Sequence, residues 1–107
     1  MIKLFNILKI LSIIKMRIKI IYGAPITSIT GKHIEEIFIE KGIKLSELIN
    51  ILINKYGFNF KNILLTEKNE VKPDVLIILN GKTISKLNEE EINNDSMLSI
   101  TGIIGGG

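Results

Sequence analysis

The chain has 107 residues, 46% of them hydrophobic and 23% charged, which is enough for one small domain with its own core and too short for two. Its mean hydropathy of +0.33 excludes the low-hydrophobicity signature of a disordered chain. Because it has no cysteine, a disulfide framework, a thiolate metal site and a cysteine nucleophile are excluded, and we expect a cytoplasmic protein.

The formal charge of +3 comes from the first 15 residues, which hold Lys3, Lys9 and Lys15 and no acid. Met16 to Gly107 then carries 11 basic and 11 acidic residues. A domain without clustered excess lysine and arginine lacks the electrostatic footprint of phosphate-backbone binding, so we expect no nucleic-acid partner.

Residues 1–15 read MIKLFNILKILSIIK, with polar residues at positions 3, 6, 9, 12 and 15. A three-residue period drifts around a helix, so no clean amphipathic face forms. The apolar run is shorter than the roughly 20 residues that span a bilayer, and no small-residue cleavage site follows, so we expect no transmembrane span. Two interpretations stay open: an upstream extension before a true start at Met16, or a short, weakly interfacial helix.

Met16 to Tyr22 alternates apolar and charged residues and predicts a strand, which Gly23-Ala24-Pro25 ends. We expect 27–32 to be a loop and His33 to Glu40 to be a β-branched strand that pairs with the first as a hairpin. His33, the only histidine, has no cysteine partner and is interpreted as solvated rather than as a metal ligand.

The clearest helix follows Gly42 and ends before Gly57, which occupies the position of a C′ glycine. Its apolar residues step by three and four, as on one helix face: Leu45, Leu48, Ile49, Leu52 and Tyr56. From Phe58 to Lys72 we expect a short packed segment and then an exposed turn.

Val75 to Leu79 is apolar on both faces, which predicts a central strand covered on both sides. Asn80-Gly81 is a strong hairpin signal because both residues accept positive φ, and Lys82 to Ile84 then returns antiparallel. The Gly81-Lys82-Thr83 sequence lacks the earlier glycine of a phosphate-binding loop. Glu89 to Glu91 is a solvated loop or helical turn, or alternatively an acidic patch that binds a partner.

The last strand, Met97 to Ile103, runs almost directly into Gly105-Gly106-Gly107. One helix with an apolar stripe must cover one face of these strands, so the order predicts a two-layer α+β domain. The three glycines place the C-terminal carboxylate on a stretch without side chains, which makes it the candidate working group. Three extended residues reach about 10 Å, enough to enter a narrow channel of another protein. An expression scar or a low-complexity tail is the alternative.

This order and tail resemble the ubiquitin-like β-grasp proteins of the ThiS/MoaD family, the sulfur carriers of thiamine and molybdopterin synthesis. The matching segments are Met16–Lys19, Leu45–Ile49, Val75–Lys82 and Asp95–Ile100, followed by the terminal Gly-Gly. The resemblance implies a mixed four- to five-stranded sheet with one main helix packed on one face. It divides the chain into an extension over 1–15, a β-grasp domain over 16–104 and a flexible glycine tail over 105–107.

Within the family, Leu64 to Asp74 is similar to archaeal-type MoaD proteins and the related small modifiers. The chain departs from the family in two places: Thr101 to Ile104 stands where Pro-Pro is usual, and Gly105 precedes the expected pair of glycines.

The resemblance implies that an adenylating enzyme of MoeB/ThiF type activates the Gly107 carboxylate with ATP, and that the acyl-adenylate becomes a thiocarboxylate. Gly105 and Gly106 would thread into the partner's active site, and Ile103 and Ile104 would either contact the partner or simply end the last strand. The sulfur would pass to a large molybdopterin synthase subunit of MoaE type or to a thiazole synthase. The chain itself would be no enzyme and would hold no catalytic residue, cofactor or metal.

Two other functions stay open. The activated carboxylate could be transferred to lysines, as in a protein modifier, or serve a ThiS-like role in thiamine synthesis or tRNA thiolation. A plain interaction module with an inert tail is the third interpretation, and it predicts no role for Gly106 and Gly107.

Overall fold

A computed structural model describes residues 15–103 of the chain. The expectations about residues 1–14 therefore lie outside the described part. Strand β1 (Lys15–Tyr22) buries every second residue and pairs antiparallel with β2 (Ile34–Glu40), which confirms the predicted hairpin. The buried side chains of β1 belong to the hydrophobic core: Met16, Ile18, Ile20 and Tyr22.

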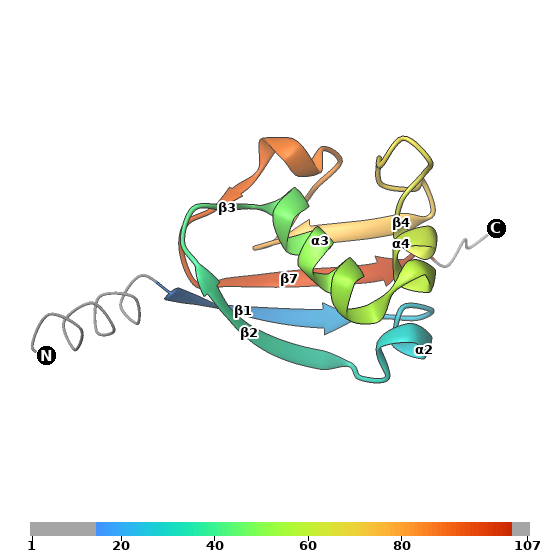
Figure 1. The fold of residues 1–107 in the computed structure, drawn as a ribbon, viewed down its shortest axis with the longest axis horizontal. Coiled ribbons are helices and arrows are strands. Elements are labelled where there is room, and N and C mark those ends of the chain that lie inside the picture. Colours follow the sequence, from blue (N-terminus) through green and yellow to red (C-terminus); the bar gives the residue numbers. More distant parts are fainter. Residues whose placement is uncertain (1–14, 104–107) are drawn as a thin grey trace, which may run out of the picture.

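Five strands form one mixed sheet in the order β2-β1-β7-β4-β5 (Figure 1). β7 (Ser96–Gly102) lies at its centre, parallel to β1 and antiparallel to β4 (Val75–Leu79). The expectation that Val75–Leu79 is the central strand is therefore wrong. Its other neighbour is only the two-residue β5 (Lys82–Thr83), and the apolar side chains on its second face, Leu76 and Ile78, are half-buried rather than covered.

Two helices cover one face of the sheet, and its other face, the outer face, carries no helix (Figure 1). α3 (Leu45–Tyr56) confirms the main predicted helix and buries Leu45, Leu48, Ile49 and Leu52. It ends at Gly57, whose φ of 90° suits a residue without a Cβ. At the start of α3 the Glu47 carboxylate accepts the backbone N–H of Lys44 at 3.2 Å, which satisfies a free amide of the first turn. The predicted short packed segment is α4 (Phe58–Leu64).

Three short elements have no counterpart among the predicted ones, and a fourth overlaps the helical turn that was one interpretation of residues 89–91. The expected loop at 27–32 contains α2 (Thr27–Thr30), which follows the fully buried Ile26. β3 (Ile43–Lys44) pairs with β6 (Glu91–Ile92) in a small second sheet, and η1 (Leu87–Glu89) is a 3₁₀ turn. The acidic run at 89–91 is thus divided between a helical turn and a strand.

The predicted hairpin turn at Asn80-Gly81 is confirmed, with φ of 50° and 84° at the two residues. The Asn80 side chain also ties this turn to β7, because it accepts the Met97 N–H at 2.9 Å and donates to the Ser96 hydroxyl at 3.0 Å. Asn80 therefore both adopts the left-handed conformation and holds two neighbouring strands together.

We expect Asn80→Ala to lower the free energy of unfolding by about 2–3 kcal/mol, because it loses the tolerance of positive φ and two hydrogen bonds. Asn69→Ala is the matched control, since Asn69 also has a positive φ, 62°, and makes no side-chain hydrogen bond among the described residues. It should cost roughly 1 kcal/mol. Urea unfolding of the two variants measures the difference, and equal losses would show that the side-chain bonds of Asn80 contribute nothing.

Candidate functional site

The end of β7 is held from both sides before the chain enters its C-terminal tail. The Gly102 N–H donates to the Ala24 carbonyl at 2.9 Å, and the Ile103 N–H donates to the Asp74 carbonyl at 2.8 Å. We call Gly102 and Ile103 the tail base. Because each backbone bond comes from a different segment, the direction in which the chain leaves the domain is fixed as far as Ile103.

Two glycines allow the backbones to approach this closely. A Cβ on Gly102 would lie 2.6 Å from Cδ of Pro25 and 3.0 Å from the Ala24 carbonyl oxygen. A Cβ on Gly23 would lie 2.1 Å from Oγ1 of Thr101. The turn at 23–25, which contains a cis Ala24–Pro25 peptide, therefore packs directly against the end of β7.

Neither Gly23 nor Gly102 was predicted to be a site residue. An isolated glycine inside a strand is a known sign of close backbone approach, so Gly102 carried a usable signal. Gly23 carried no such signal, because no local sequence pattern shows that the turn at 23–25 packs against the distant end of β7.

We expect Gly102→Ala to lower the free energy of unfolding by about 1–3 kcal/mol, because a ring atom of Pro25 and a backbone oxygen must both move. The amide signals of Gly102 and Ile103 should shift as their hydrogen bonds lengthen. Ser99→Ala, a half-buried change in the same strand, should leave both quantities nearly unaltered. Thermal unfolding and amide chemical shifts provide the readout, and wild-type values for Gly102→Ala would contradict the tight packing.

Ile103, predicted as a possible partner contact, is half exposed at the end of the described chain. It lies just beyond β7, which ends at Gly102, and the described residues leave half of its surface uncovered. The other predicted site residues, Ile104, Gly105, Gly106 and Gly107, lie outside the described residues. In Figure 1 the tail base lies at the same end of the domain as α2 and α4.

The outer face carries an apolar patch beside this strand. Cross-strand register places Ile34 next to Ile21, and Ile21 next to Ser99, on neighbouring strands of this face. Ile34 and Met97 are exposed and the others are half-buried, so the described residues do not cover them. We call the following residues the outer patch: Ile21, Ile34, Leu76, Ile78 and Met97. Ser99 of β7 lies between Ile21 of β1 and Ile78 of β4, so the apolar side chains lie on both sides of one small polar residue. Exposed apolar residues gathered on one face are typical of protein interfaces.

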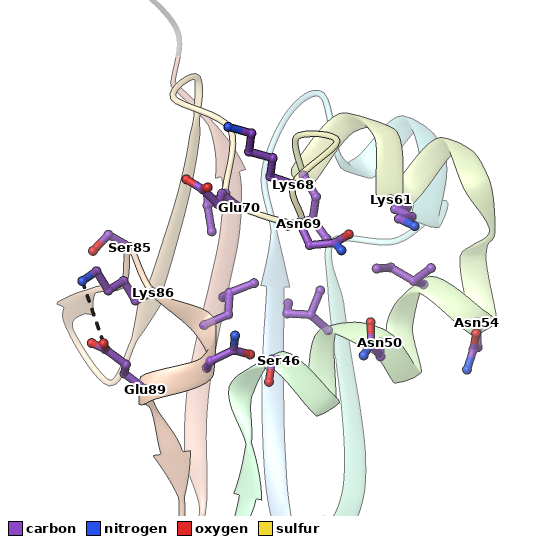
Figure 2. Close-up of a pocket in the computed structure, with 16 residues that line it drawn as sticks. Ser46, Asn50, Asn54, Lys61, Lys68, Asn69, Glu70, Ser85, Lys86 and Glu89 are labelled. Carbon is purple, nitrogen blue, oxygen red and sulfur yellow. Dashed lines mark ion pairs between the residues drawn. The ribbon is translucent and has the colours of Figure 1, made fainter.

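The helical side has a different surface, an open groove of about 920 Å³ between α3, the loop at 66–70 and η1 (Figure 2). Its lining is mainly lysine, asparagine and serine, with Ile49, Leu65 and Leu87 buried at its floor. Lys86 and Glu89 form an ion pair at 3.8 Å on its rim. Among the described residues, no three His, Cys, Asp or Glu side chains are grouped so as to hold a metal.

The acidic run at 89–91 does not form a single charged patch. Glu89 pairs with Lys86, and Glu90 accepts from Lys82 at 2.9 Å, so two of the three acids have lysine partners. Glu91 is exposed in β6.

A buried carboxylate that the sequence analysis did not single out lies at the edge of the core. Glu35 is on the inner side of β2, and its Oε1 accepts hydrogen bonds from the Tyr22 and Tyr56 hydroxyls, each at 2.6 Å. Lys55 donates to its other oxygen, and Lys32 lies 3.5 Å from that oxygen. Glu36, the next residue of β2, is exposed, so the two neighbouring carboxylates lie on opposite faces of the strand.

These partners decide the ionisation of the cluster. Burial raises the pKa of Glu35, but the hydrogen bonds from Lys55, Tyr22 and Tyr56 outweigh it and lower the pKa from 4.5 to about 2. Burial and the neighbouring carboxylate raise the pKa of the Tyr22 hydroxyl far above its usual value. Glu35 is therefore ionised and both tyrosines are neutral at physiological pH. Both carboxylate oxygens of Glu35 have partners within the described residues, so the cluster joins β1, β2 and α3 and stabilises the fold.

These features define the class of fold. A mixed sheet whose first and last long strands run parallel at its centre, with one main helix across a single face, is a ubiquitin-like β-grasp. The predicted fold class is thus confirmed. No helix within residues 15–103 combines the length and the apolar character that a membrane crossing needs.

Solved structures share this fold. Urm1 from Trypanosoma brucei has a TM-score of 0.71 and 12% identity, over 87% of this chain and 97% of its own. SAMP1 from Haloferax volcanii, a small archaeal modifier protein, has a TM-score of 0.70 and 12% identity, and the match covers 85% of this chain and 99% of SAMP1. A Pyrococcus furiosus protein described as molybdopterin converting factor subunit 1 has a TM-score of 0.65 and 22% identity, and the match covers 83% of this chain and 99% of that protein. At these identities the likeness shows the fold, and it confirms at that level the resemblance that the sequence indicates.

No protein-family model and no curated protein sequence matches the chain.

Proposed function

We propose that this chain is a sulfur carrier whose Gly107 carboxylate is activated by an adenylating enzyme and converted to a thiocarboxylate. The observation that carries the proposal is the tail base, where two backbone hydrogen bonds from separate segments fix the departing chain just ahead of a glycine-only end. A rigid base and a side-chain-free end let a partner's narrow active site receive the carboxylate while the domain stays outside.

The proposed chemistry takes place in two balanced steps. A carboxylate oxygen of Gly107 attacks the α-phosphorus of ATP, and the bond to the β-phosphate breaks, which releases pyrophosphate and leaves an acyl-adenylate. A hydrosulfide ion (HS⁻), bound by the partner but not covalently attached to it, then attacks the carbonyl carbon, the bond from that carbon to the phosphate oxygen breaks, AMP leaves, and the S–H proton is lost to solvent to give the thiocarboxylate. No electrons are exchanged in either step. The chain supplies the reacting carboxylate, and the partner supplies all catalytic groups.

The outer patch is the surface that we assign to partner recognition. It is apolar, lies on the face without helices, and includes Met97 on the same strand that leads to the tail base. A partner seated there would hold the tail in a constant position relative to its own active site.

We expect Met97→Glu to slow activation of the chain by the adenylating enzyme at least about tenfold, because it places a charge within the apolar contact. Phe58→Glu is the matched control: Phe58 is 75% exposed, against 46% for Met97, but lies on the helical side. It should leave activation unchanged. Rates of ATP-dependent pyrophosphate exchange with each variant measure the effect, and equal losses, or none, would move recognition away from the outer patch.

For the destination of the sulfur we propose molybdopterin synthesis, with a MoaE-type large synthase subunit as acceptor. The support is the fold likeness to the P. furiosus protein described as a molybdopterin converting factor subunit, together with the archaeal MoaD-like stretch at 64–74. Thiazole synthesis and tRNA thiolation are the alternatives. Deleting the gene and adding back each end product in turn identifies the pathway, because only the correct one restores growth or enzyme activity.

A second candidate function is conjugation to lysines of other proteins through Gly107. It is favoured by the fold likeness to SAMP1, which is described as a small archaeal modifier protein. Both functions need the same acyl-adenylate and separate at the next step. Peptide mass spectrometry of the host proteome finds Gly107 in isopeptide linkage if the chain is a modifier, and finds none if it is only a carrier.

A further inference from the structure

Two hollows meet at Phe38, at the end of the domain where β1 begins. One, of about 430 Å³, lies between the β2–β3 turn and α3 and includes Ile39, Ile43 and Ile51 in its lining. The other, of about 470 Å³, lies toward the outer face and is lined by Lys15, Arg17, Phe38 and Asp95. Phe38 is 66% exposed and Ile51 43%. We call the two together the Phe38 hollow; its apolar side chains are left uncovered by the described residues.

The chain itself supplies an apolar segment next to this hollow. Lys15 lines both hollows, and it is directly preceded by residues 1–14, of which ten are hydrophobic. An extended chain advances about 3.4 Å per residue, so five residues span roughly 17 Å and reach across a hollow that begins at Lys15. A segment tethered at the rim also has an effective concentration in the millimolar range, which favours contact within the chain.

We propose that residues 1–14 pack against the Phe38 hollow of their own chain. Phe5, Leu8 and Leu11 are among the apolar side chains that would leave water there, together with Phe38 and Ile51. The lining of the Phe38 hollow carries as many basic residues (Lys15, Arg17 and Lys41) as acidic ones (Glu40, Glu47 and Asp95), so the proposal rests on the apolar side chains and on the tether at Lys15.

The packed segment would cover one corner of the outer face. Phe38 is on that face, paired in register with Arg17 of β1. The inference does not depend on the chemistry proposed for Gly107.

A spin label tests the packing directly, since the natural chain has no cysteine. Lys41→Cys places a nitroxide on an exposed residue at the rim of the hollow, and Lys68→Cys places the same label on the loop at the opposite end of the domain (Figure 1). In NMR spectra of the full chain, we expect the nitroxide at position 41 to lower the intensity of the amide signals of residues 4–11 at least about twofold, compared with the same chain after the nitroxide has been chemically reduced. The nitroxide at position 68 should leave these intensities unchanged.

A further variant separates packing from mere tethering near Lys15. Adding Phe38→Ser and Ile51→Ser to the Lys41→Cys chain removes two exposed apolar side chains, and the signals of residues 4–11 should then recover. Equal signal loss with and without the two serines would overturn the proposal, and so would no loss at all. Signal loss in an isotope-labelled chain mixed with a separate spin-labelled chain would assign the contact to a second copy instead.

Discussion

A chain without Gly106 and Gly107 is expected to fold as the full chain does and to be completely inactive as a carrier. The hydrogen bonds that fix the tail base end at Ile103, so the free energy of unfolding should change by less than about 0.5 kcal/mol. The new terminal carboxylate would fall short of the partner's reacting groups by two extended residues, roughly 7 Å. Thermal unfolding and ATP-dependent pyrophosphate exchange, run side by side, measure both effects.

Replacement of the last residue refines this test. Gly107→Leu keeps the length of the tail but adds a branched side chain beside the attacked carbon, and we expect activation to fall by roughly a hundredfold or more, equivalent to about 2.7 kcal/mol in the barrier. Gly107→Ala adds only a methyl group and should be intermediate. Normal activation of the leucine variant would mean that the carboxylate is not the group on which the chain acts.

Loss of the buried carboxylate is the largest stability effect that we expect. Glu35→Ala leaves the buried Tyr22 hydroxyl without its acceptor and separates Lys55 from its counter-ion, which should lower the free energy of unfolding by about 2–4 kcal/mol. Glu36→Ala, one residue along the same strand and exposed, should change it by less than about 0.5 kcal/mol. Urea unfolding at pH 7 compares the two. Similar free energies of unfolding for the two variants would mean that the Glu35 cluster does not stabilise the fold.

The same carboxylate makes stability depend on pH in a defined direction. Its pKa is about 2 in the folded chain against 4.5 ordinarily, so the unfolded chain takes up the proton first as the pH falls. The stabilisation, roughly 3 kcal/mol, is fully present above about pH 5 and is lost progressively toward pH 2. Glu35→Gln should flatten the stability profile in this window, because glutamine does not titrate. A profile as steep as that of the natural chain would assign the acid sensitivity to other carboxylates.

The parts of the fold that were predicted correctly have strong local patterns. The alternation in β1, the three-four spacing in α3 and the Asn80-Gly81 turn each depend on residues close together in the chain. The place of β4 was not predictable in this way, because strand order is set by pairing between distant segments. Its apolar run indicated a central strand, whereas the run reflects one core face and one partly exposed patch.

In the candidate site, too, the local features could be predicted from the sequence and the contacts between distant segments could not. The glycine end and Ile103 are visible in the sequence, but the tail base is fixed by bonds from Gly102 to Ala24 and from Ile103 to Asp74, and no local pattern connects these segments. The Glu35 cluster likewise combines side chains from β1, β2 and α3. A clue was present, because Glu35 alternates in phase with Ile37 and Ile39 and so falls on the inner face of its strand.

Our main proposal is that the carboxylate of Gly107 becomes a reactive acyl group. The most direct test is the intact mass of the chain purified from its native host. We predict a population that ends at Gly107 and is heavier by the exchange of one oxygen for sulfur, which disappears when the adenylating enzyme is deleted. A population that is wholly unmodified while that enzyme is active, or one that retains residues beyond Gly107, would contradict the claim.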